Sequence, residues 1–359
     1  MKAHLTPAFA ALGHQENWGQ IARIVGTMRT PPQLPLTDAE LREVVPWIPP
    51  RTVSRLHVAA ADDSAEVAGI YIETFITPDE LAMPPNRRIL EKVRDGIKAA
   101  EREGARVVTL GGFTSILLEG TNYQPIDGFA LTTGNSLTAA LIVRGIERAA
   151  SLLGRPLDAE TLLVIGATGD VGSACARSFA GRTRQLLLAA RNQRRLDAEA
   201  ALLRDSGPVT ASTNVTALLR QATMIVAVAS TVEPTFTMAD CHPDAVVCDA
   251  GYPKNICVNH GSMGRRRIFW GGMGVLGGGI RSDNGVVETI YRFPRANVAH
   301  GCMLEGMVLA IASRYEAFSV GRGRITPARV EEMWQLARAS GVTLAPLFDS
   351  IGVWPEEAV

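Results

Sequence analysis

Apolar and polar positions along the chain predict an alternation of strands and helices. Alternating residues over Ile70–Ile76 predict a half-buried strand, and the apolar run Thr161–Ile165 predicts another. Between these two strands, Ile89, Val93 and Ile97 recur at the spacing that places them on one face of an amphipathic helix. The pattern therefore predicts an α/β protein.

From residue 158 onwards the alternation becomes regular. Strands separated by helices imply a parallel sheet with right-handed crossovers, in which ligands bind at the carboxyl ends of the strands. The expected strands cover residues 162–165, 185–190, 224–229, 245–248 and 268–270, with helices through residue 177 and over residues 194–203. We expect a Rossmann-type, doubly wound parallel sheet here.

The glycine-rich segment after the strand Thr161–Ile165 is the most informative motif. Its glycines follow G-x-x-G-x-x-G spacing and a helical pattern comes next, as in turns that hold a dinucleotide pyrophosphate. Glycine admits the phosphates close to the backbone, and the helix directs its unpaired N–H groups at them. A glycine turn without a ligand is the alternative. The expected cofactor contacts are Gly166, Thr168, Gly169, Asp170, Val171 and Gly172.

The end of the next strand indicates which dinucleotide binds. An acidic residue at this position takes the ribose hydroxyls of NAD, but here Arg191 and Asn192 follow the strand. A guanidinium suits a 2′-phosphate, so we predict NADPH. Arg194 and Arg195 follow, although they also fit a solvated helix start. Further cofactor contacts are expected from Ser230, Thr231 and Gly251.

These elements predict the following domain organisation. Residues 1–135 form an N-terminal α/β substrate domain, residues 136–157 a connecting helix, and residues 158–280 the NADP-binding Rossmann domain. Residues 281–359 form a C-terminal helical segment that packs back on the N-terminal domain. Within it, we expect helices over residues 296–319 and from the N-cap Thr326.

Composition narrows the function classes. The 36 basic and 36 acidic residues cancel, which gives no global attraction to nucleic acid, and an apolar share of 47% is ordinary for a globular enzyme. No signal peptide or membrane-spanning run is recognisable, so we expect a cytoplasmic protein, with peripheral membrane contact left open. The five cysteines form neither a zinc pattern nor a disulfide framework, and no metal is expected.

Several segments together resemble the aldehyde-forming long-chain fatty acyl-ACP reductases, best known from cyanobacteria. The resemblance covers most of the chain but departs from the family pattern at Gly271–Gly279, where relatives have a His-containing, acidic stretch. The matching segments are Leu110–Ile116, Thr132–Asn135, Gly166–Ala174, Gly251–Asn255, Gly321–Arg322 and Arg324–Thr326, with weaker similarity at Gly13–His14 and Tyr71–Glu73.

The resemblance implies NADPH-dependent reduction of a fatty acyl thioester, either acyl-ACP or acyl-CoA, to the aldehyde. The acyl group would pass through a cysteine thioester, and the family's spacing identifies Cys302 as the nucleophile and Glu305 as the glutamate that follows it. A helix N-terminus or a cationic neighbour would help the thiol to ionise. His300 is near in sequence, although helical positions two apart do not face each other.

Each remaining candidate has a structural alternative. Glu305 fits a proton relay or an ordinary helix glutamate. Lys254 fits a group that polarises the thioester carbonyl, a phosphate ligand or a surface lysine. The expected substrate contacts are Phe113, Thr114, Ser115 and Met303, of which the two hydroxyl residues also fit a turn and Met303 also fits a core.

The expected partners are an acyl carrier protein or acyl-CoA as donor, and an aldehyde-consuming enzyme is conceivable. Arg87, Arg88, Lys92, Arg94 and Lys98 could dock an acidic carrier, although interleaved acidic residues also fit intrahelical pairs. Two other functions stay open. One is a noncovalent NADP-dependent dehydrogenase of the shikimate or amino-acid type acting on a small polar substrate, and the other is a nucleotide-binding regulator without turnover.

Overall fold

The computed structural model describes residues 6–29, 35–62, 65–82, 87–118, 129–258, 267–319 and 323–355. The chain divides into two compact units. Unit 1 contains residues 1–134, 275–320 and 336–343, and unit 2 contains residues 135–274, 321–335 and 344–359. The expected connecting helix therefore groups with unit 2, and the expected C-terminal helical segment is shared between the two units.

Unit 1 is built on a six-stranded mixed sheet with strand order β15-β2-β3-β1-β4-β5. Strands β3, β1, β4 and β5 are parallel, whereas β2 and β15 are antiparallel to their neighbours. The carboxyl ends of four strands consequently meet at one edge of this sheet. Its strands are β1 (Phe9–Gly13), β2 (Arg51–Ala59), β3 (Glu66–Glu73), β4 (Val107–Leu110), β5 (Ala130–Thr132) and β15 (Ile280–Ser282).

Two helices of unit 1 cover opposite faces of this sheet. A Cβ on Gly96 of α4 (Arg87–Arg102) would meet the Leu12 side chain, whereas one on Gly306 of α11 (Gly301–Ile311) would meet Thr109. Leu12 pairs in register with the residue after Thr109, so these two side chains point to opposite faces. The other helices of unit 1 are α1 (Trp18–Thr27), α2 (Asp38–Val44), η1 (Val45–Trp47), α3 (Pro78–Ala82), α5 (Phe113–Leu118) and α10 (Val286–Tyr291).

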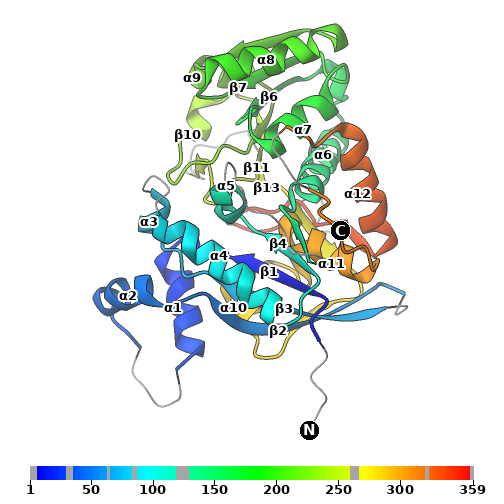
Figure 1. Cartoon of the computed structure of the whole chain (residues 1–359). Helices are drawn as coiled ribbons and strands as arrows, with labels where there is room; N and C mark the ends of the chain where they lie inside the picture. Colours follow the sequence, from blue (N-terminus) through cyan, green and yellow to red (C-terminus); the bar gives the residue numbers. More distant parts are fainter. Residues whose placement is uncertain are drawn as a thin grey trace. The chain divides into compact units, whose positions relative to one another are not determined.

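Unit 2 contains a second six-stranded sheet, with order β13-β11-β9-β6-β7-β8, and every described pairing in it is parallel (Figure 1). Its two central strands, β9 and β6, are buried along their whole length, as expected where helices cover both faces of such a sheet. This confirms the predicted Rossmann-type α/β fold. The strands are β6 (Thr161–Ile165), β7 (Gln185–Ala189), β8 (Val209–Ser212), β9 (Met224–Ala227), β11 (Val246–Asp249) and β13 (Arg267–Trp270).

The helices of unit 2 begin and end largely where the sequence signals predict. The long helix α6 ends just before Gly154, which has a φ of +64°. The hydroxyl of Thr326 accepts from the backbone N–H of Arg329, which confirms Thr326 as the N-cap of α12. The elements are α6 (Asn135–Leu152), η2 (Leu157–Ala159), α7 (Asp170–Phe179), α8 (Gln193–Leu203), η3 (Arg204–Ser206), α9 (Val215–Leu219), β10 (Phe236–Thr237), η4 (Met238–Asp240), β12 (Ile256–Cys257) and α12 (Pro327–Ala339).

Three segments differ from the sequence-based expectation. The strand expected over Ile70–Ile76 ends at Glu73, and Phe75 adopts a φ of +53° that no strand tolerates. The helix expected over residues 296–319 is wrong at both ends, because Val298–His300 form strand β16, and α11 begins at Gly301 and ends at Ile311. Residues 281–359, expected to be helical, also contain the short strand β17 (Val342–Leu344). In addition, strand β14 (Met273–Leu276) lies within the glycine-rich stretch Gly271–Gly279.

In the part of the chain that the structure describes, no helix combines the length and apolar character needed to cross a lipid bilayer.

Candidate functional site

The glycine turn of unit 2 has the geometry of a phosphate-binding loop. Gly166 follows β6 with a φ of +90°, and its backbone N–H donates to the carbonyl of Ala189 at 2.8 Å. Gly169 is the N-cap of α7 and contributes no side-chain cap, so the first N–H groups of that helix have no side-chain acceptor from the cap residue. A phosphate oxygen fits these groups because they also lie at the positive end of the helix dipole.

Two glycines of this turn have no room for a side chain. A Cβ on Gly172 would overlap the carbonyl oxygen of Gly166, and a Cβ on Gly166 would meet the backbone N of Ala229 at 2.8 Å. Asp170 is buried, and its carboxylate accepts from the backbone N–H of Gly323 at 2.8 Å. Thr168 and Val171 are half-buried in the same turn. The residues of the turn therefore fit a dinucleotide pyrophosphate, with Asp170 also anchoring the chain at Gly323.

Arg191 and Asn192 follow the carboxyl end of β7, the strand next to β6. Asn192 is the N-cap of α8, and its Oδ1 accepts from the backbone N–H of Arg195 at 3.0 Å. The Arg191 side chain is exposed. Arg191 thus stays the candidate for a 2′-phosphate, while Asn192 has a structural role in starting α8.

Asp249, at the end of β11, organises the loop that contains the remaining cofactor candidates. This fully buried carboxylate accepts from three backbone N–H groups, those of Gly251 (2.8 Å), Asn255 (2.7 Å) and Ile256 (2.9 Å). Burial nevertheless raises the pKa of Asp249, and these three donors with the nearby Lys254 lower it only in part. Sequence reasoning missed Asp249 because it follows directly on an apolar strand and belongs to no motif.

Asn255 joins this loop to the end of β9. Its amide donates to the carbonyl of Ala229 at 2.8 Å and to the hydroxyl of Thr231 at 3.2 Å, and its Oδ1 accepts from the N–H of Ala229 at 2.8 Å. Ser230 between them is exposed. The cofactor candidates Ser230, Thr231 and Gly251 therefore lie on two cross-linked loops at the carboxyl ends of adjacent strands, where a Rossmann sheet binds its ligand.

Lys254 lies in unit 2, on the same loop. Its Nζ donates to the carbonyl of Gly251 at 3.0 Å and lies 5.0 Å from the centroid of the Trp270 ring. These contacts show a half-buried lysine that stabilises the loop. The proposed roles of Lys254 toward a thioester carbonyl or a phosphate stay predictions.

In unit 1, Cys302 lies at the edge where the parallel strands end. A Cβ on Gly111, directly after β4, would lie 3.7 Å from the Cys302 sulfur, and one on Gly134, shortly after β5, would overlap the Cys302 backbone. The hydroxyl of Thr109 donates to the carbonyl of Cys302 and fixes the first turn of α11 against β4. Over Gly301–Ala310, all of them described, Cys302 alone is not buried. Cys302, a free cysteine, is therefore the one half-buried residue among the first ten of α11.

The environment of the Cys302 sulfur disfavours the thiolate. Burial raises the pKa of the thiol to about 11, and the backbone N–H groups of Gly112 and Met303, which face the sulfur, lower it only in part. At neutral pH only about one thiol in ten thousand would be ionised without help. Nucleophilic chemistry at this sulfur therefore requires a group that accepts its proton.

His300 and Glu305 occupy different positions around Cys302. His300 is the N-cap of α11, and its ring packs edge-on against Tyr291, with ring centroids 5.2 Å apart, and against Phe293 at 5.4 Å. Glu305 is fully buried and accepts from the hydroxyls of Thr132 and of Ser319, the latter at 3.0 Å. Glu305 thus joins α11 to β5, the structural alternative considered above, while a proton-relay role for either residue stays a prediction.

The predicted substrate contacts mostly close turns or fill the core. Thr114 donates to the carbonyl of Gly111 at 2.8 Å, and Ser115 donates to that of Gly112 at 3.1 Å, so both hydroxyls complete the turn that starts α5. The Met303 side chain is buried. Phe113 is half-buried, and its backbone N–H donates to Nε2 of His14 at 2.9 Å.

The sequence did not reveal a buried polar cluster near the edge of the unit 1 sheet where the parallel strands end. Gln15 donates through Nε2 to Tyr71 Oη at 2.9 Å and to Glu73 Oε2 at 2.6 Å. Burial raises the pKa of the Glu73 carboxyl to about 7 and lowers that of His14 to about 4. Only the weak similarity at Gly13–His14 and Tyr71–Glu73 pointed toward these residues.

The basic residues of α4 are largely occupied by neighbours. Arg87 pairs with Glu91 and Lys98 with Asp95 along the helix, as the intrahelical alternative predicts. Lys92 is buried, in contrast to the surface position expected, because its Nζ bonds the carbonyl of Phe75 and the carboxylate of Glu80. The motif residues Gly321 and Arg322 lie outside the described residues.

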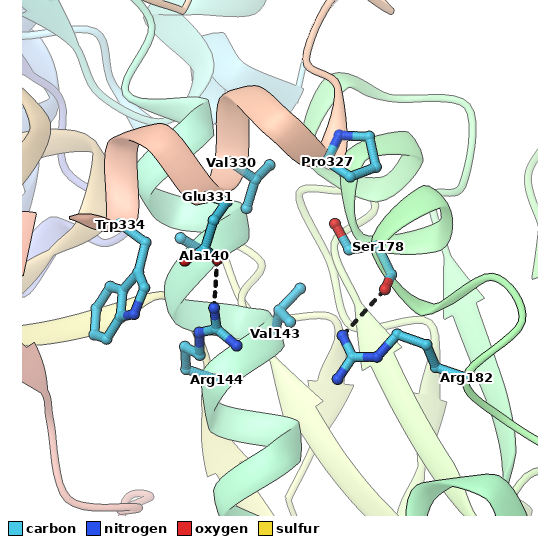
Figure 2. Close-up of a pocket in the computed structure, with 9 residues that line it drawn as sticks. All are labelled: Ala140, Val143, Arg144, Ser178, Arg182, Pro327, Val330, Glu331 and Trp334. Atoms are coloured by element: carbon cyan, nitrogen blue, oxygen red, sulfur yellow. Dashed lines mark hydrogen bonds and ion pairs between the residues drawn. The ribbon is translucent and has the colours of Figure 1, made fainter. Parts of the chain in front are cut away.

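A cavity of about 130 Å³ in unit 2 is lined by α6, the end of α7 and α12 (Figure 2). Arg144 forms ion pairs with Glu147 (2.8 Å) and Glu331 (2.5 Å), and Arg182 pairs with Glu147 and also donates to the carbonyl of Ser178. Because carboxylates already face both guanidinium groups, the cavity presents little net charge to a ligand. It contains none of the predicted site residues.

Comparison with known proteins complements this geometry. No family model matches the chain. A long-chain acyl-[acyl-carrier-protein] reductase from Synechococcus elongatus is 32% identical over 312 residues, which cover 81% of this chain and 86% of that protein. The aminotransferase PigE from a Serratia species is 26% identical over 268 residues, covering 73% of this chain and 30% of PigE.

Similar solved structures include two enzymes with low sequence identity. Glutamyl-tRNA reductase from Methanopyrus kandleri is 16% identical, covers 69% of this chain and 67% of its own, and has a TM-score of 0.30. Quinate dehydrogenase from Corynebacterium glutamicum in complex with NAD is 13% identical, and the match covers 69% of this chain and 81% of the dehydrogenase chain, with a TM-score of 0.34.

The match to the Synechococcus protein extends over most of both sequences and includes both halves of the fold described above. Identity at this level over such a length shows common descent. The chain therefore belongs to the long-chain acyl-[acyl-carrier-protein] reductase family and is an oxidoreductase.

Proposed function

We propose that this protein reduces a long-chain acyl thioester to the aldehyde, with NADPH as reductant and Cys302 as a transient acyl carrier. The observation that supports this most is the position of Cys302. Cys302 is the one residue over Gly301–Ala310 that is half-buried rather than buried, and it lies at the carboxyl edge of four parallel strands beside two glycines. In α/β proteins, this edge of a parallel sheet is where ligands bind.

A cysteine suits the chemistry because it lets the reduction stop at the aldehyde. The Cys302 sulfur would attack the acyl carbon and expel the thiol of the donor, which leaves the acyl group on the enzyme. Reduction of this thioester gives a hemithioacetal, which collapses when it expels the Cys302 thiolate. The backbone N–H groups of Gly112 and Met303 face the sulfur and would stabilise that thiolate.

The residues of unit 2 fit the cofactor. The turn Gly166–Gly172 and the first N–H groups of α7 would hold the pyrophosphate, and the exposed Arg191 would bind a 2′-phosphate, which favours NADPH over NADH. The loops of Thr231 and Gly251, cross-linked by Asn255, would border the nicotinamide. When bound, this cofactor supplies the hydride.

For the donor, we propose an acyl carrier protein, as the name of the Synechococcus relative indicates, with acyl-CoA as a second donor. The thioester chemistry is the same for both. An acidic carrier would meet Arg94 of α4 rather than Arg88, which pairs with Glu80, or the buried Lys92. Titrating acyl-ACP and acyl-CoA in parallel, with kcat/KM as the readout, would rank the two donors.

Intact-protein mass spectrometry tests the covalent step directly. Incubation with a long-chain acyl-CoA without NADPH should add one acyl mass to the wild type, and Cys302→Ala should abolish the adduct. Cys257→Ala is the matched control, because Cys257 is also a free thiol, is exposed, and lies in unit 2. Addition of NADPH should then remove the adduct and release aldehyde.

An adduct that persists in Cys302→Ala would remove Cys302 from its proposed role. NADPH oxidation without any adduct would instead favour a noncovalent dehydrogenase. Assays with a panel of small hydroxy acids distinguish that alternative from acyl-thioester reduction.

A further inference from the structure

Two arginines without carboxylate partners lie where α1 packs against the end of α10. Arg23, on α1, donates from Nη2 to the carbonyl of Ile290 at 3.2 Å, and Arg292 follows two residues later. The Nε atom of Arg23 is buried and has no hydrogen-bond acceptor. Among the described residues, no carboxylate pairs with Arg23 or with the exposed Arg292. The charges of both guanidinium groups are therefore uncompensated.

The two positive charges repel each other. Burial lowers the pKa of the Arg23 guanidinium, and the charge of Arg292 lowers it further. Other arginines of unit 1, such as Arg42 and Arg55, each pair with a carboxylate. Guanidinium groups hold phosphate well, because their N–H groups form parallel hydrogen bonds to two of its oxygens. A bound phosphate would therefore relieve the repulsion between Arg23 and Arg292.

This arginine pair is connected to Cys302 by aromatic contacts. Arg292 lies between Tyr291 and Phe293, whose rings stack with centroids 5.3 Å apart. Both rings also pack edge-on against the ring of His300, at 5.2 and 5.4 Å. His300 is the N-cap of α11, two residues before Cys302. An anion held by the arginines would therefore bind in the surroundings of Cys302, with aromatic rings between them.

We propose that Arg23 and Arg292 bind the phosphate of the phosphopantetheine arm of the acyl donor. The inference rests on the proposed function and names the group that the protein recognises in both donors. Acyl-ACP and acyl-CoA share this arm, which has a phosphate at one end and the acyl thioester at the other. Two amide units separate these ends, so the phosphate stays at the arginines while the thioester reaches the Cys302 sulfur.

Two acyl donors that differ only in the phosphate test the proposal. Acylation of Cys302 is followed by intact-protein mass spectrometry without NADPH, with acyl-phosphopantetheine and acyl-pantetheine carrying the same long chain. Since an ionic hydrogen bond contributes about a factor of ten or more, the two arginines should favour the phosphorylated donor roughly 100-fold in the second-order rate constant. Added salt should reduce this preference, because it screens the charges.

Two variants remove one charge each with little other change. Arg292→Asn suits the backbone, because Arg292 has a φ of +49° and Asn adopts this conformation more readily than most residues. Arg23→Gln keeps an N–H donor for the carbonyl of Ile290. In each variant the preference for the phosphorylated donor should fall about tenfold, whereas the rate with acyl-pantetheine should equal that of the wild type. Arg102→Ala, in unit 1 and also exposed, is the matched control and should keep the full preference.

Comparison of acyl-ACP with acyl-CoA shows whether the arginines recognise the shared phosphate. Acylation by both donors should fall about tenfold in Arg292→Asn. A loss confined to acyl-CoA would assign the arginines to the nucleotide of CoA, and a loss confined to acyl-ACP would assign them to the protein surface of the carrier. Either of these results would overturn the proposal.

Calorimetric titration with phosphopantetheine and pantetheine, neither of which carries an acyl group, keeps the test independent of acyl transfer. The wild type should bind phosphopantetheine more tightly, and the difference should shrink in Arg23→Gln and Arg292→Asn. If the binding follows this pattern but no donor acylates Cys302, the proposed function fails and the phosphate site stands. Acylation of Cys302 with an unchanged preference in both variants refutes the phosphate site alone.

Discussion

Gly134 contacts the backbone of Cys302 so closely that a Cβ on Gly134 would overlap the Cα of Cys302. Gly134 also has a φ of +72°, a conformation that L-residues with side chains rarely adopt. The loop after β5 therefore fixes the position of the first turn of α11. This contact makes Gly134 a determinant of the site, although it contributes no functional group.

Gly134→Ala should consequently destabilise the protein and misplace Cys302. Backbone strain and overpacking together predict a loss of about 2–4 kcal/mol in the free energy of unfolding, measured by urea titration. Gly154→Ala is the control, because Gly154 has a φ of +64° but nothing within 4 Å of the added Cβ. It should lose only about 1 kcal/mol. Equal losses in the two variants would refute the proposed overlap.

The neutral imidazole of His14 makes stability depend on pH. Burial lowers the pKa of His14 from 6.5 to about 4, so the unfolded chain binds a proton that the folded protein does not bind between these values. The contribution of His14 to the free energy of unfolding is therefore complete above about pH 6.5. It declines as the pH falls toward 4, by roughly 3 kcal/mol in total. Urea titrations at several pH values should show this decline in the wild type. His14→Gln keeps an acceptor for the N–H of Phe113 but cannot titrate, so the same decline in that variant would contradict the assignment.

Glu73 has the opposite effect on stability. Its pKa is raised from 4.5 to about 7 on folding, so the folded protein holds a proton that the unfolded chain has lost between these values. The resulting contribution of Glu73 to the free energy of unfolding, again roughly 3 kcal/mol, is fully present below about pH 4.5 and is lost as the pH rises through 7. Compared with Glu73→Gln, the wild type should therefore lose stability over this range. A constant difference between the two proteins from pH 4.5 to 8 would show that the carboxyl is not perturbed.

Arg191→Ala should reduce the preference for NADPH. An ionic hydrogen bond to a 2′-phosphate contributes about 1.5–3 kcal/mol, which predicts an increase of roughly tenfold or more in the KM for NADPH and little change for NADH. Arg204→Ala, at the opposite end of α8, is a matched control with an exposed guanidinium. If both cofactors lose affinity equally, Arg191 does not bind the 2′-phosphate.

Local signals in the sequence predicted a substantial part of the fold. Strand β6, the turn at Gly166 and the N-cap at Thr326 each depend on neighbouring residues, and the structure shows them at the expected positions. The start of α11 was predicted wrongly because Val298–His300 form a strand through tertiary pairing that no local periodicity reveals.

The chemistry around Cys302 could be predicted only in part. The family spacing points to Cys302, whose role as nucleophile stays a prediction. The contacts of Glu73 with Gln15, which is 58 residues away along the chain, arise from the pairing of β1 with β3. Lys92 was predicted at the surface because its helix is rich in charged residues. In the structure its side chain is buried, and its Nζ donates to the carbonyl of Phe75. Such long-range contacts require three-dimensional coordinates.

The burial of α11 has a consequence for engineering. Leu304, Met307 and Val308 are fully buried. The helix that carries the Cys302 sulfur is therefore also part of the core. Replacing any of these side chains with a smaller one would destabilise the protein by about 2–5 kcal/mol. Variants that alter the surroundings of Cys302 should therefore leave the buried face of this helix unchanged.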